Sequence, residues 1–174
     1  MPGPLEVDPI HAAYQQWIDA GWGDAADGMA TVTSVIRAQQ ILMARVDEVL
    51  RPLGLTFARF ELLMLLRFSR TGRLPMSKAS TRLQVHPASV TNAADRLEAA
   101  GLVQRTPHPS DGRTTLIELT PTGRTVVENA ATALNEHVFS VPGISNTAAR
   151  ELVAVLTGLR REAGDFNATA KSFD

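Results

Sequence analysis

The sequence predicts a mostly α-helical protein with one small β-hairpin, and three observations lead to this fold class. Hydrophobic residues make up 44% of the 174 residues and aromatic residues only 5%, which suits a helical core built from leucine, valine and alanine. Apolar residues recur three or four positions apart, the period of an α-helix, along most of the chain. The alternation that is typical of β-strands is found at residues 103–106 and 114–119.

Residues 1–26 form an N-terminal extension. Three prolines and one glycine in residues 1–9 predict a mobile tail. A short amphipathic helix is expected next, because apolar residues follow at helical spacing: Ile10, Tyr14, Trp17 and Ile18. The segment Gly-Trp-Gly at 21–23 interrupts this helix, and Asp24 or Asp27 is expected to cap the next one.

Residues 27–55 are predicted to form a long dimerisation helix. Its stripe positions are three and four apart, with neighbours that widen the stripe on one side: Met29, Val32, Val35, Ile36, Gln39, Leu42, Met43, Val46, Val49 and Leu50. Arg51-Pro52 and Gly54 end the helix. A stripe this wide on so long a helix needs more partner surface than a small domain offers.

Residues 56–124 are predicted to form a helical domain that ends in the hairpin. Thr56 is expected to cap a first helix that runs to about Arg70. This helix is apolar on most of its surface: Phe57, Phe60, Leu63, Met64, Leu66 and Phe68. A short extended segment, Leu74 to Met76, follows it.

Two short helices joined by a tight turn come next. Ser77 is expected to cap the first, which ends at Leu83, and Gln84-Val85 form the turn. The second begins at His86-Pro87, because a cap followed by proline is a common helix start. One face of this second helix is expected to be buried, and Gly101 ends the helix in the left-handed conformation. The buried residues are predicted to be Val90, Ala93, Ala94 and Leu97.

The hairpin follows directly. Val103, Leu116 and Leu119 are expected to face the core, while Arg105 and Glu118 face outwards. The loop between the strands, residues 107–113, contains two prolines and is expected to turn at Asp-Gly, residues 111–112. Helix, turn, helix and hairpin in this order form a winged helix-turn-helix, a shape that presents one helix to the major groove of DNA.

Residues 125–174 are predicted to be C-terminal dimerisation helices. Thr120-Pro121 begins one helix and Ser145 begins the last. Both carry an apolar face: Val127, Ala131, Leu134 and Val138 on the first, and Leu152, Val155, Leu156, Leu159 and Phe166 on the second. We expect a homodimer in which the two ends of each chain pack against those of the other; packing within one chain is the alternative.

The charge distribution supports a nucleic-acid partner. The net charge is −1, but residues 56–125 contain ten Lys/Arg and five Asp/Glu, whereas both flanking segments are acidic. A basic middle supplies the attraction to phosphate on which DNA affinity depends. Taken alone, this split barely exceeds ordinary scatter.

The exposed face of the second short helix carries the side chains that we expect to contact DNA. Asn pairs with adenine, and Ser and Thr bond bases or phosphates, so Ser89, Thr91 and Asn92 suit a helix in the major groove. Pro87 starts the helix, small Ala88 permits close approach, and Arg96 lies on the same face. Lys78 and Arg82, near the two ends of the preceding helix, are expected to lie along the phosphate backbone. Any exposed helix has a polar face, so the context of turn and hairpin carries this interpretation.

Asp111 and Arg113 occupy the hairpin tip. Asp111 is able to pair with the backbone or with Arg113, and Arg113 is the best candidate for a probe of the minor groove, where negative potential is concentrated. The alternative for an arginine at or near the hairpin tip is that its side chain is simply solvated. This alternative suits Arg105 better than Arg113.

The chain resembles the MarR family of bacterial regulators over about residues 55–124. The similarity rests on Ser-Val-Thr at 89–91, Asp-Arg-Leu-Glu at 95–98, Gly-Leu-Val at 101–103, Arg105, Asp-Gly-Arg at 111–113 and Leu-Thr-Pro-Thr-Gly at 119–123. The resemblance implies a triangular homodimer on a pseudo-palindromic double-stranded DNA operator, with Arg113 in the minor groove. It also implies a repressor that a small amphipathic or aromatic effector releases from DNA.

Two features depart from the family pattern. Many relatives have arginine at the position of Asn92, which bears on base preference rather than on the mode of binding. The N-terminal extension is the second departure.

The resemblance places an effector pocket between the dimer helices and the winged domain. Candidate wall residues are Trp22, Met29 and Arg37, with Phe60 and Met64 from the next helix, although plain core positions are the better interpretation for Phe60 and Met64. Tyr14, Trp17 and Trp22 are expected to form an apolar lid or an added dimer contact. Arg37 is able to pair with a carboxylate.

Other classes of function have less support. The histidines share no spacing with one another or with carboxylates that suggests a metal site or a nucleophile–base pair, so we expect no enzyme, no metal and no cofactor. Without cysteines, thiol chemistry is excluded. No apolar run reaches the length of a membrane span and no signal peptide is evident, so we expect a cytoplasmic protein. A winged-helix interaction module or ligand sensor without specific DNA binding remains the alternative.

Overall fold

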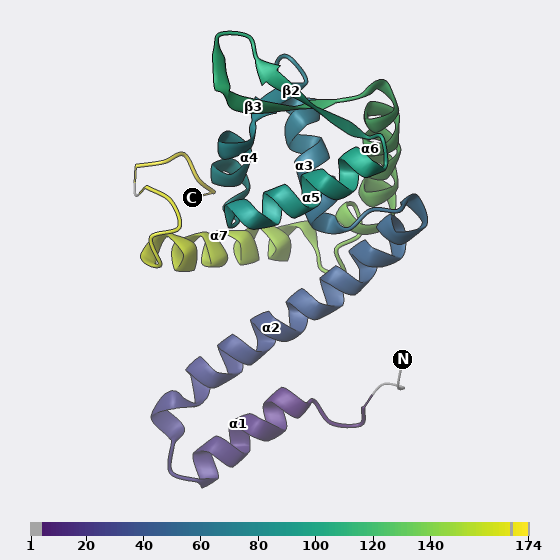
Figure 1. The fold of residues 1–174 in the computed structure, drawn as a ribbon. Helices are drawn as coiled ribbons and strands as arrows, with labels where there is room; N and C mark the ends of the chain where they lie inside the picture. Colours follow the sequence, from purple (N-terminus) through teal and green to yellow (C-terminus); the bar gives the residue numbers. More distant parts are fainter. Residues whose placement is uncertain (1–4, 168, 174) are drawn as a thin grey trace. The chain divides into compact units, whose positions relative to one another are not determined.

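The computed structural model describes residues 5–167 and 169–173 of the chain (Figure 1). The first four residues of the predicted N-terminal tail lie outside the described residues. The chain divides into two compact units, residues 1–58 and 59–174, and each is described by itself.

The first unit is a pair of helices, α1 (Pro9–Asp19) and α2 (Gly23–Leu50), that contact each other. Gly21 joins them with a φ of 84°, a value that favours glycine. The Tyr14 hydroxyl donates a hydrogen bond to Asp27, which raises the pKa of Tyr14 because the bond and the negative charge both favour the protonated phenol. Trp17 and Trp22 meet edge to face, with ring centroids 5.4 Å apart. The predicted short amphipathic helix is confirmed.

The prediction that Asp24 or Asp27 caps α2 is wrong. Trp22 occupies the cap position, and no side chain bonds the first turn there. The helix starts at Gly23, so Asp24 already lies in the first turn. There its negative charge interacts favourably with the positive end of the helix dipole. Asp27 lies further along and accepts the Tyr14 hydroxyl.

The far end of α2 agrees with the prediction. The helix ends at Leu50 and continues as a 3₁₀ turn, η1 (Arg51–Leu53), which closes at Gly54 with a φ of 69°. The middle of α2 leaves large apolar side chains exposed, between 41% and 59% of their surface: Val32, Val35, Ile36, Ile41 and Leu42.

The second unit is mostly helical with a small antiparallel sheet in the order β1-β3-β2, which confirms the predicted fold class. Its elements are α3 (Phe57–Phe68, which starts at the unit boundary), β1 (Arg73–Pro75), α4 (Met76–Leu83), α5 (Pro87–Ala99), β2 (Val103–His108), β3 (Asp111–Leu119), α6 (Pro121–Leu134), a π-helical turn η2 (Asn135–Phe139) and α7 (Asn146–Glu162). The hairpin of β2 and β3, called the wing below, lies at the top of Figure 1.

The core of this unit draws on most of its elements. The innermost side chains are at most 2% exposed: Leu62, Leu63 and Leu66 from α3, Ala79 from α4, Val90, Ala94 and Leu97 from α5, Val103 and Ile117 from the sheet, and Val127, Ala130 and Leu134 from α6. The predicted core positions Leu116 and Leu119 are also buried. Ile117, which was not among the predicted core positions, is also buried; it shares a face of β3 with Leu119, while Leu116 lies on the other face, so both faces of β3 are covered here.

Three boundaries differ from the sequence-based expectation. α3 ends at Phe68 rather than near Arg70. The segment at 73–75 is a third strand that pairs with β3, with Leu74 opposite Ile117. α4 starts at Met76 with Pro75 in the cap position, so Ser77 is the second residue of the helix and does not cap it.

The turn of the wing also differs. Asp111 pairs with His108 across the hairpin, so Pro109-Ser110 make the turn and the Asp-Gly pair begins β3. The strands are therefore longer than predicted, and Arg113 lies within β3 rather than in a loop.

The starts of α6 and α7 are as predicted. Thr120 Oγ1 accepts the N–H of Gly123 at 2.9 Å, and Ser145 Oγ accepts the N–H of Ala148 at 3.2 Å. Gly123 lies so close to the wing that a Cβ there would be 1.9 Å from the carbonyl oxygen of Leu102. Glycine is therefore required where α6 begins.

Candidate nucleic-acid interface

The start of α5, called the recognition helix below, is held by local bonds. Gln84 adopts a left-handed φ of 54° in the turn, the single positive φ of a non-glycine residue among the described residues. Its side chain donates to the carbonyl of Asp165 at 2.7 Å. His86 Nδ1 accepts the N–H of Ala88 at 3.2 Å, and Pro87 is the first helical residue. The predicted helix start is confirmed.

The recognition helix has one buried and one exposed face. Val90, Ala94 and Leu97 are almost completely buried, and the predicted Ala93 is half-buried. The predicted DNA-contacting side chains of this helix are all exposed: Pro87, Ala88, Ser89, Thr91, Asn92 and Arg96. The apolar face anchors the helix in the core, and the polar face is exposed to solvent.

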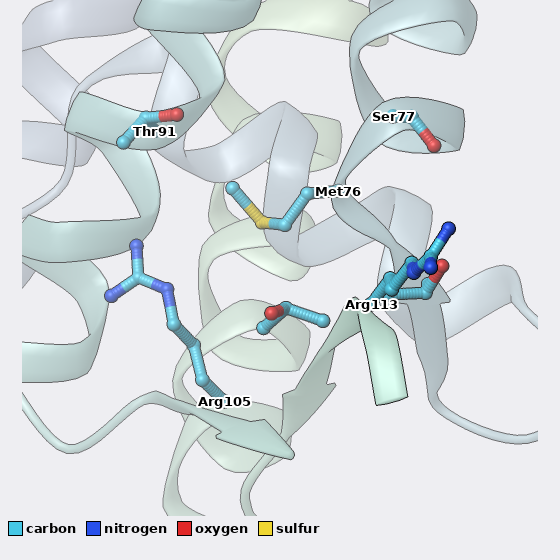
Figure 2. Close-up of a pocket in the computed structure, with 7 residues that line it drawn as sticks. Met76, Ser77, Thr91, Arg105 and Arg113 are labelled. Carbon is cyan, nitrogen blue, oxygen red and sulfur yellow. The ribbon is translucent and has the colours of Figure 1, made fainter. Parts of the chain in front are cut away.

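A hollow of about 410 Å³ opens between this helix, the start of α4 and the wing (Figure 2). Its lining is Met76, Ser77, Thr91, Arg105, Arg113, Thr114 and Thr115. Figure 2 shows Arg105 and Arg113 on opposite sides of Met76, with Thr91 and Ser77 at the other edge. The Arg113 guanidinium and several hydroxyls around one hollow suit an anionic partner such as phosphate.

Asp111 shapes the wing next to Arg113. Its Oδ2 accepts the hydroxyl of Thr114 at 2.7 Å, and its Oδ1 accepts the backbone N–H of Arg113 at 3.1 Å. These two bonds lower the pKa of Asp111, because both favour the carboxylate. Of the two pairings open to Asp111, the structure has the one with the backbone. Within residues 5–167 and 169–173, the exposed Arg113 guanidinium makes no ion pair.

Arg105 behaves differently from the prediction that it faces outwards into solvent. Its Nη2 lies 2.5 Å from Asp95 Oδ1, and its Nη1 pairs with Glu98 Oε2. Glu98 Oε1 also accepts the backbone N–H of Arg105 at 3.0 Å. The bond to Asp95 and the two carboxylate charges raise the pKa of Arg105. The sequence suggested no such cluster, because its members are seven and ten residues apart across the turn that follows α5.

The remaining predicted contacts are distributed around these groups. Asn92 and Arg96 line a second hollow of about 540 Å³ with Asp95 and Ala99. Lys78 and Arg82 are exposed on α4 and line neither hollow. Sequence reasoning missed Met76, Thr114 and Thr115, whose only advance signal was their position beside the helix start and the wing arginine.

The predicted effector residues fall in both units. In the first, Trp22 is 58% exposed, Met29 is half-buried, and Arg37 donates to Gln40 at 3.2 Å. In the second, Phe60 is 6% exposed and Met64 is half-buried, which suits core positions. The described residues contain no group of three or more His, Asp or Glu side chains placed to hold a metal. No helix in the described part of the chain is long and apolar enough to cross a membrane.

The fold and this surface define a winged helix-turn-helix protein. Residues 55–115 match the model of the MarR family. The chain is 50% identical to Sco5413, a MarR family transcriptional regulator from Streptomyces coelicolor, with a TM-score of 0.74; the match covers 81% of this chain and 98% of that one. The chain belongs to the MarR family, whose members are transcriptional regulators and not enzymes.

Two further relatives show the range of similarity. The HTH-type transcriptional regulator YhbI of Bacillus subtilis is 35% identical over 85 residues, 49% of this chain, and the match spans about half, 54%, of its length. The structure of BpsR from Bordetella bronchiseptica, in a study of the regulation of its DNA binding by 6-hydroxynicotinic acid, is 29% identical with a TM-score of 0.65; the match covers 76% of this chain and 91% of that one.

Proposed function

We propose that this chain is a sequence-specific double-stranded DNA-binding regulator that inserts α5 into the major groove. The observation that carries the proposal is that Thr91 of the recognition helix and Arg113 of the wing line one hollow. A groove reader and a flanking cation on the same surface are what a duplex requires, because bases specify and phosphates position. Ser89, Asn92 and Arg96 extend the polar face of the same helix.

The protein binds DNA as a homodimer on a pseudo-palindromic operator. Large apolar side chains of α2 are exposed, and so are Leu152, Val155 and Leu159 of α7. Exposed apolar residues in such number on two helices mark an interaction surface. A two-fold dimer places two recognition helices about 34 Å apart, the repeat of the DNA helix. A cytoplasmic location follows from this role.

The regulator is a repressor that a small amphipathic or aromatic effector releases from DNA. The BpsR study supports an aromatic acid as the type of effector, since 6-hydroxynicotinic acid regulates DNA binding there. Trp22 supports an aromatic ligand here, because it keeps 58% of its surface exposed beside Trp17. Met29 and Arg37 on α2 are the other members of the proposed set, in which Arg37 pairs with a carboxylate of the effector.

DNA binding is tested by titrating the protein with the DNA upstream of its own gene and with random DNA, each over a series of salt concentrations. We expect specific binding that weakens as salt is added. The slope of log affinity against log salt concentration should become shallower by roughly 0.9 in Arg113→Ala if that arginine neutralises one phosphate. Asn92→Ala should instead cost roughly 1–3 kcal/mol at one base position and relax specificity there. Equal affinity for both DNAs would favour the interaction-module alternative.

Effector binding is tested by tryptophan fluorescence. Salicylate and 6-hydroxynicotinate serve as probes, with Trp17→Phe and Trp22→Phe variants to assign the signal. We expect quenching that disappears in Trp22→Phe, together with release from operator DNA at the same concentrations. Unchanged fluorescence at concentrations that release DNA would show that the effector binds away from Trp22.

A further inference from the structure

The cluster of Arg105 with Asp95 and Glu98 joins the wing to the recognition helix. Arg105 belongs to β2, whereas both carboxylates belong to α5. Glu98 contacts Arg105 twice, through the guanidinium and through the backbone N–H at 3.0 Å. Because a backbone bond is included, the cluster holds the strand itself and not only a side chain.

The guanidinium is already occupied by these partners. Nη1 faces Glu98 and Nη2 lies 2.5 Å from Asp95, so each terminal nitrogen has a carboxylate partner. The Arg105 side chain is 29% exposed and those of Asp95 and Glu98 are 53% and 38% exposed. Partial burial makes the cluster stronger than a surface pair, and the planar fork of arginine suits two carboxylates at once.

The position of the cluster gives it a consequence for DNA binding. Arg105 lines the same hollow as Thr91 and Arg113, and Asp95 lines the neighbouring hollow with Asn92 and Arg96. Without Arg105, two carboxylates on the recognition helix lose their partner beside the proposed phosphate path. The wing that carries Arg113 also loses its side-chain link to α5.

We propose that Arg105 is a positioning residue, which fixes the wing on the recognition helix so that α5 and Arg113 engage one duplex together. The inference rests on the proposed DNA-binding function. It assigns Arg105 no phosphate of its own, which separates it from Arg113, whose guanidinium is exposed and makes no ion pair among the described residues.

Two variants that change the charge in opposite directions test the proposal. Arg105→Gln removes a positive charge, and the double variant Asp95→Asn/Glu98→Gln removes two negative charges. Simple attraction to phosphate predicts weaker binding for the first and tighter binding for the second. Positioning predicts weaker operator binding for both, by about tenfold, because either change breaks the charged bonds between wing and helix.

Binding is measured at about 0.15 M salt, where distant charges are screened. Arg67→Gln is the matched control, since Arg67 of α3 pairs with Glu128 of α6 at 2.7 Å with similar exposure, outside both hollows. Arg105→Lys keeps the charge but not the fork, and should bind DNA with an affinity between those of wild type and Arg105→Gln. The salt slope of Arg105→Gln should stay close to that of wild type.

A second readout needs no DNA. Amide hydrogen exchange of the free protein should become faster in β2, the Arg105 amide included, in both cluster variants and not in Arg67→Gln. If the wild-type protein shows no specific DNA binding, the proposed function is overturned. The exchange result still shows whether the cluster holds the wing on the recognition helix. Unchanged exchange overturns the inference, as does tighter operator binding by Asp95→Asn/Glu98→Gln. If Arg105→Gln fails to fold, the double variant and Arg105→Lys give the same two readouts.

Discussion

Helices α2 and α5 are both amphipathic, yet the apolar residues of α5 are buried and many of those of α2 are exposed. Val90, Ala94 and Leu97 of α5 are at most 2% exposed, whereas Val32, Ile36 and Leu42 of α2 are between 41% and 59% exposed. The polar residues of α5 are the ones left at the surface. The apolar side of α5 is therefore buried within its own unit, while α2 keeps an exposed apolar surface, on which we propose that a second copy of the chain packs.

The difference shows that the same helical spacing of apolar residues occurs both on a helix buried in a core and on a helix with an exposed apolar face. A short apolar stripe on a helix of 13 residues is matched by the small core of the second unit. Much of the broad stripe on the 28-residue helix α2 stays exposed. Substitutions should consequently affect folding in the second unit and assembly on α2.

The largest effect on folding is expected at Gly123. A Cβ there would lie 1.9 Å from the Leu102 carbonyl oxygen, so Gly123→Ala must move the wing or α6 and should lower the free energy of unfolding by about 3 kcal/mol. Gly28→Ala on α2 is the matched change, with open space around the added methyl group. It should raise the free energy of unfolding by up to about 1 kcal/mol. Urea denaturation at fixed protein concentration measures both, and equal effects would contradict the comparison.

The proposed assembly surface is tested at Ile36. Ile36→Glu places a charge in the exposed apolar stripe and should weaken the dimer by at least about tenfold, or roughly 1.4 kcal/mol. Ser34→Glu adds the same charge on the other side of α2 and should leave the dimer intact. Sedimentation equilibrium gives both dissociation constants. A dimer that tolerates Ile36→Glu would rule out this stripe as the interface.

A smaller effect is expected inside the wing at Thr106. Its Oγ1 is buried and has no hydrogen-bond partner within the described residues. Thr106→Val replaces this hydroxyl with a methyl group of similar shape, so the free energy of unfolding should rise by about 1 kcal/mol. The Thr114→Val control removes a hydroxyl that bonds Asp111 and should lower stability instead. Thermal unfolding followed by circular dichroism distinguishes the two signs.

The smallest effect depends on pH and comes from Glu61 of α3. Partial burial raises the pKa of Glu61 above its ordinary value of 4.5, because the charged form loses hydration. The folded state therefore holds this proton more tightly, and stability falls as pH rises from the unfolded pKa through the folded one. Glu61→Gln should raise the free energy of unfolding by roughly 0.5 kcal/mol at pH 7 and by nothing at pH 3.5. A gain of equal size at both values would show that ionisation is not the cause.

Much of the candidate interface was predictable because its signals are local. The start of α5 needs only His86 and Pro87, and its exposed polar face follows from the spacing of Val90, Ala94 and Leu97. The turn of the wing was misplaced, since Asp-Gly is a strong local turn signal, but the pairing of His108 with Asp111 shifts the turn to Pro109-Ser110. Pairing with a neighbouring strand decides such a position.

By itself, the sequence determined the order of the helices and the wing, most helix starts and ends, the basic middle of the chain and the polar face of α5. Each of these depends on residues within a few positions of one another, through capping, periodicity or fixed backbone angles. Only the tertiary structure decided that Arg105 binds Asp95 and Glu98, that β1 joins the sheet and that Gly123 lies against Leu102. These contacts join separate elements, and their geometry exists only once the elements have packed.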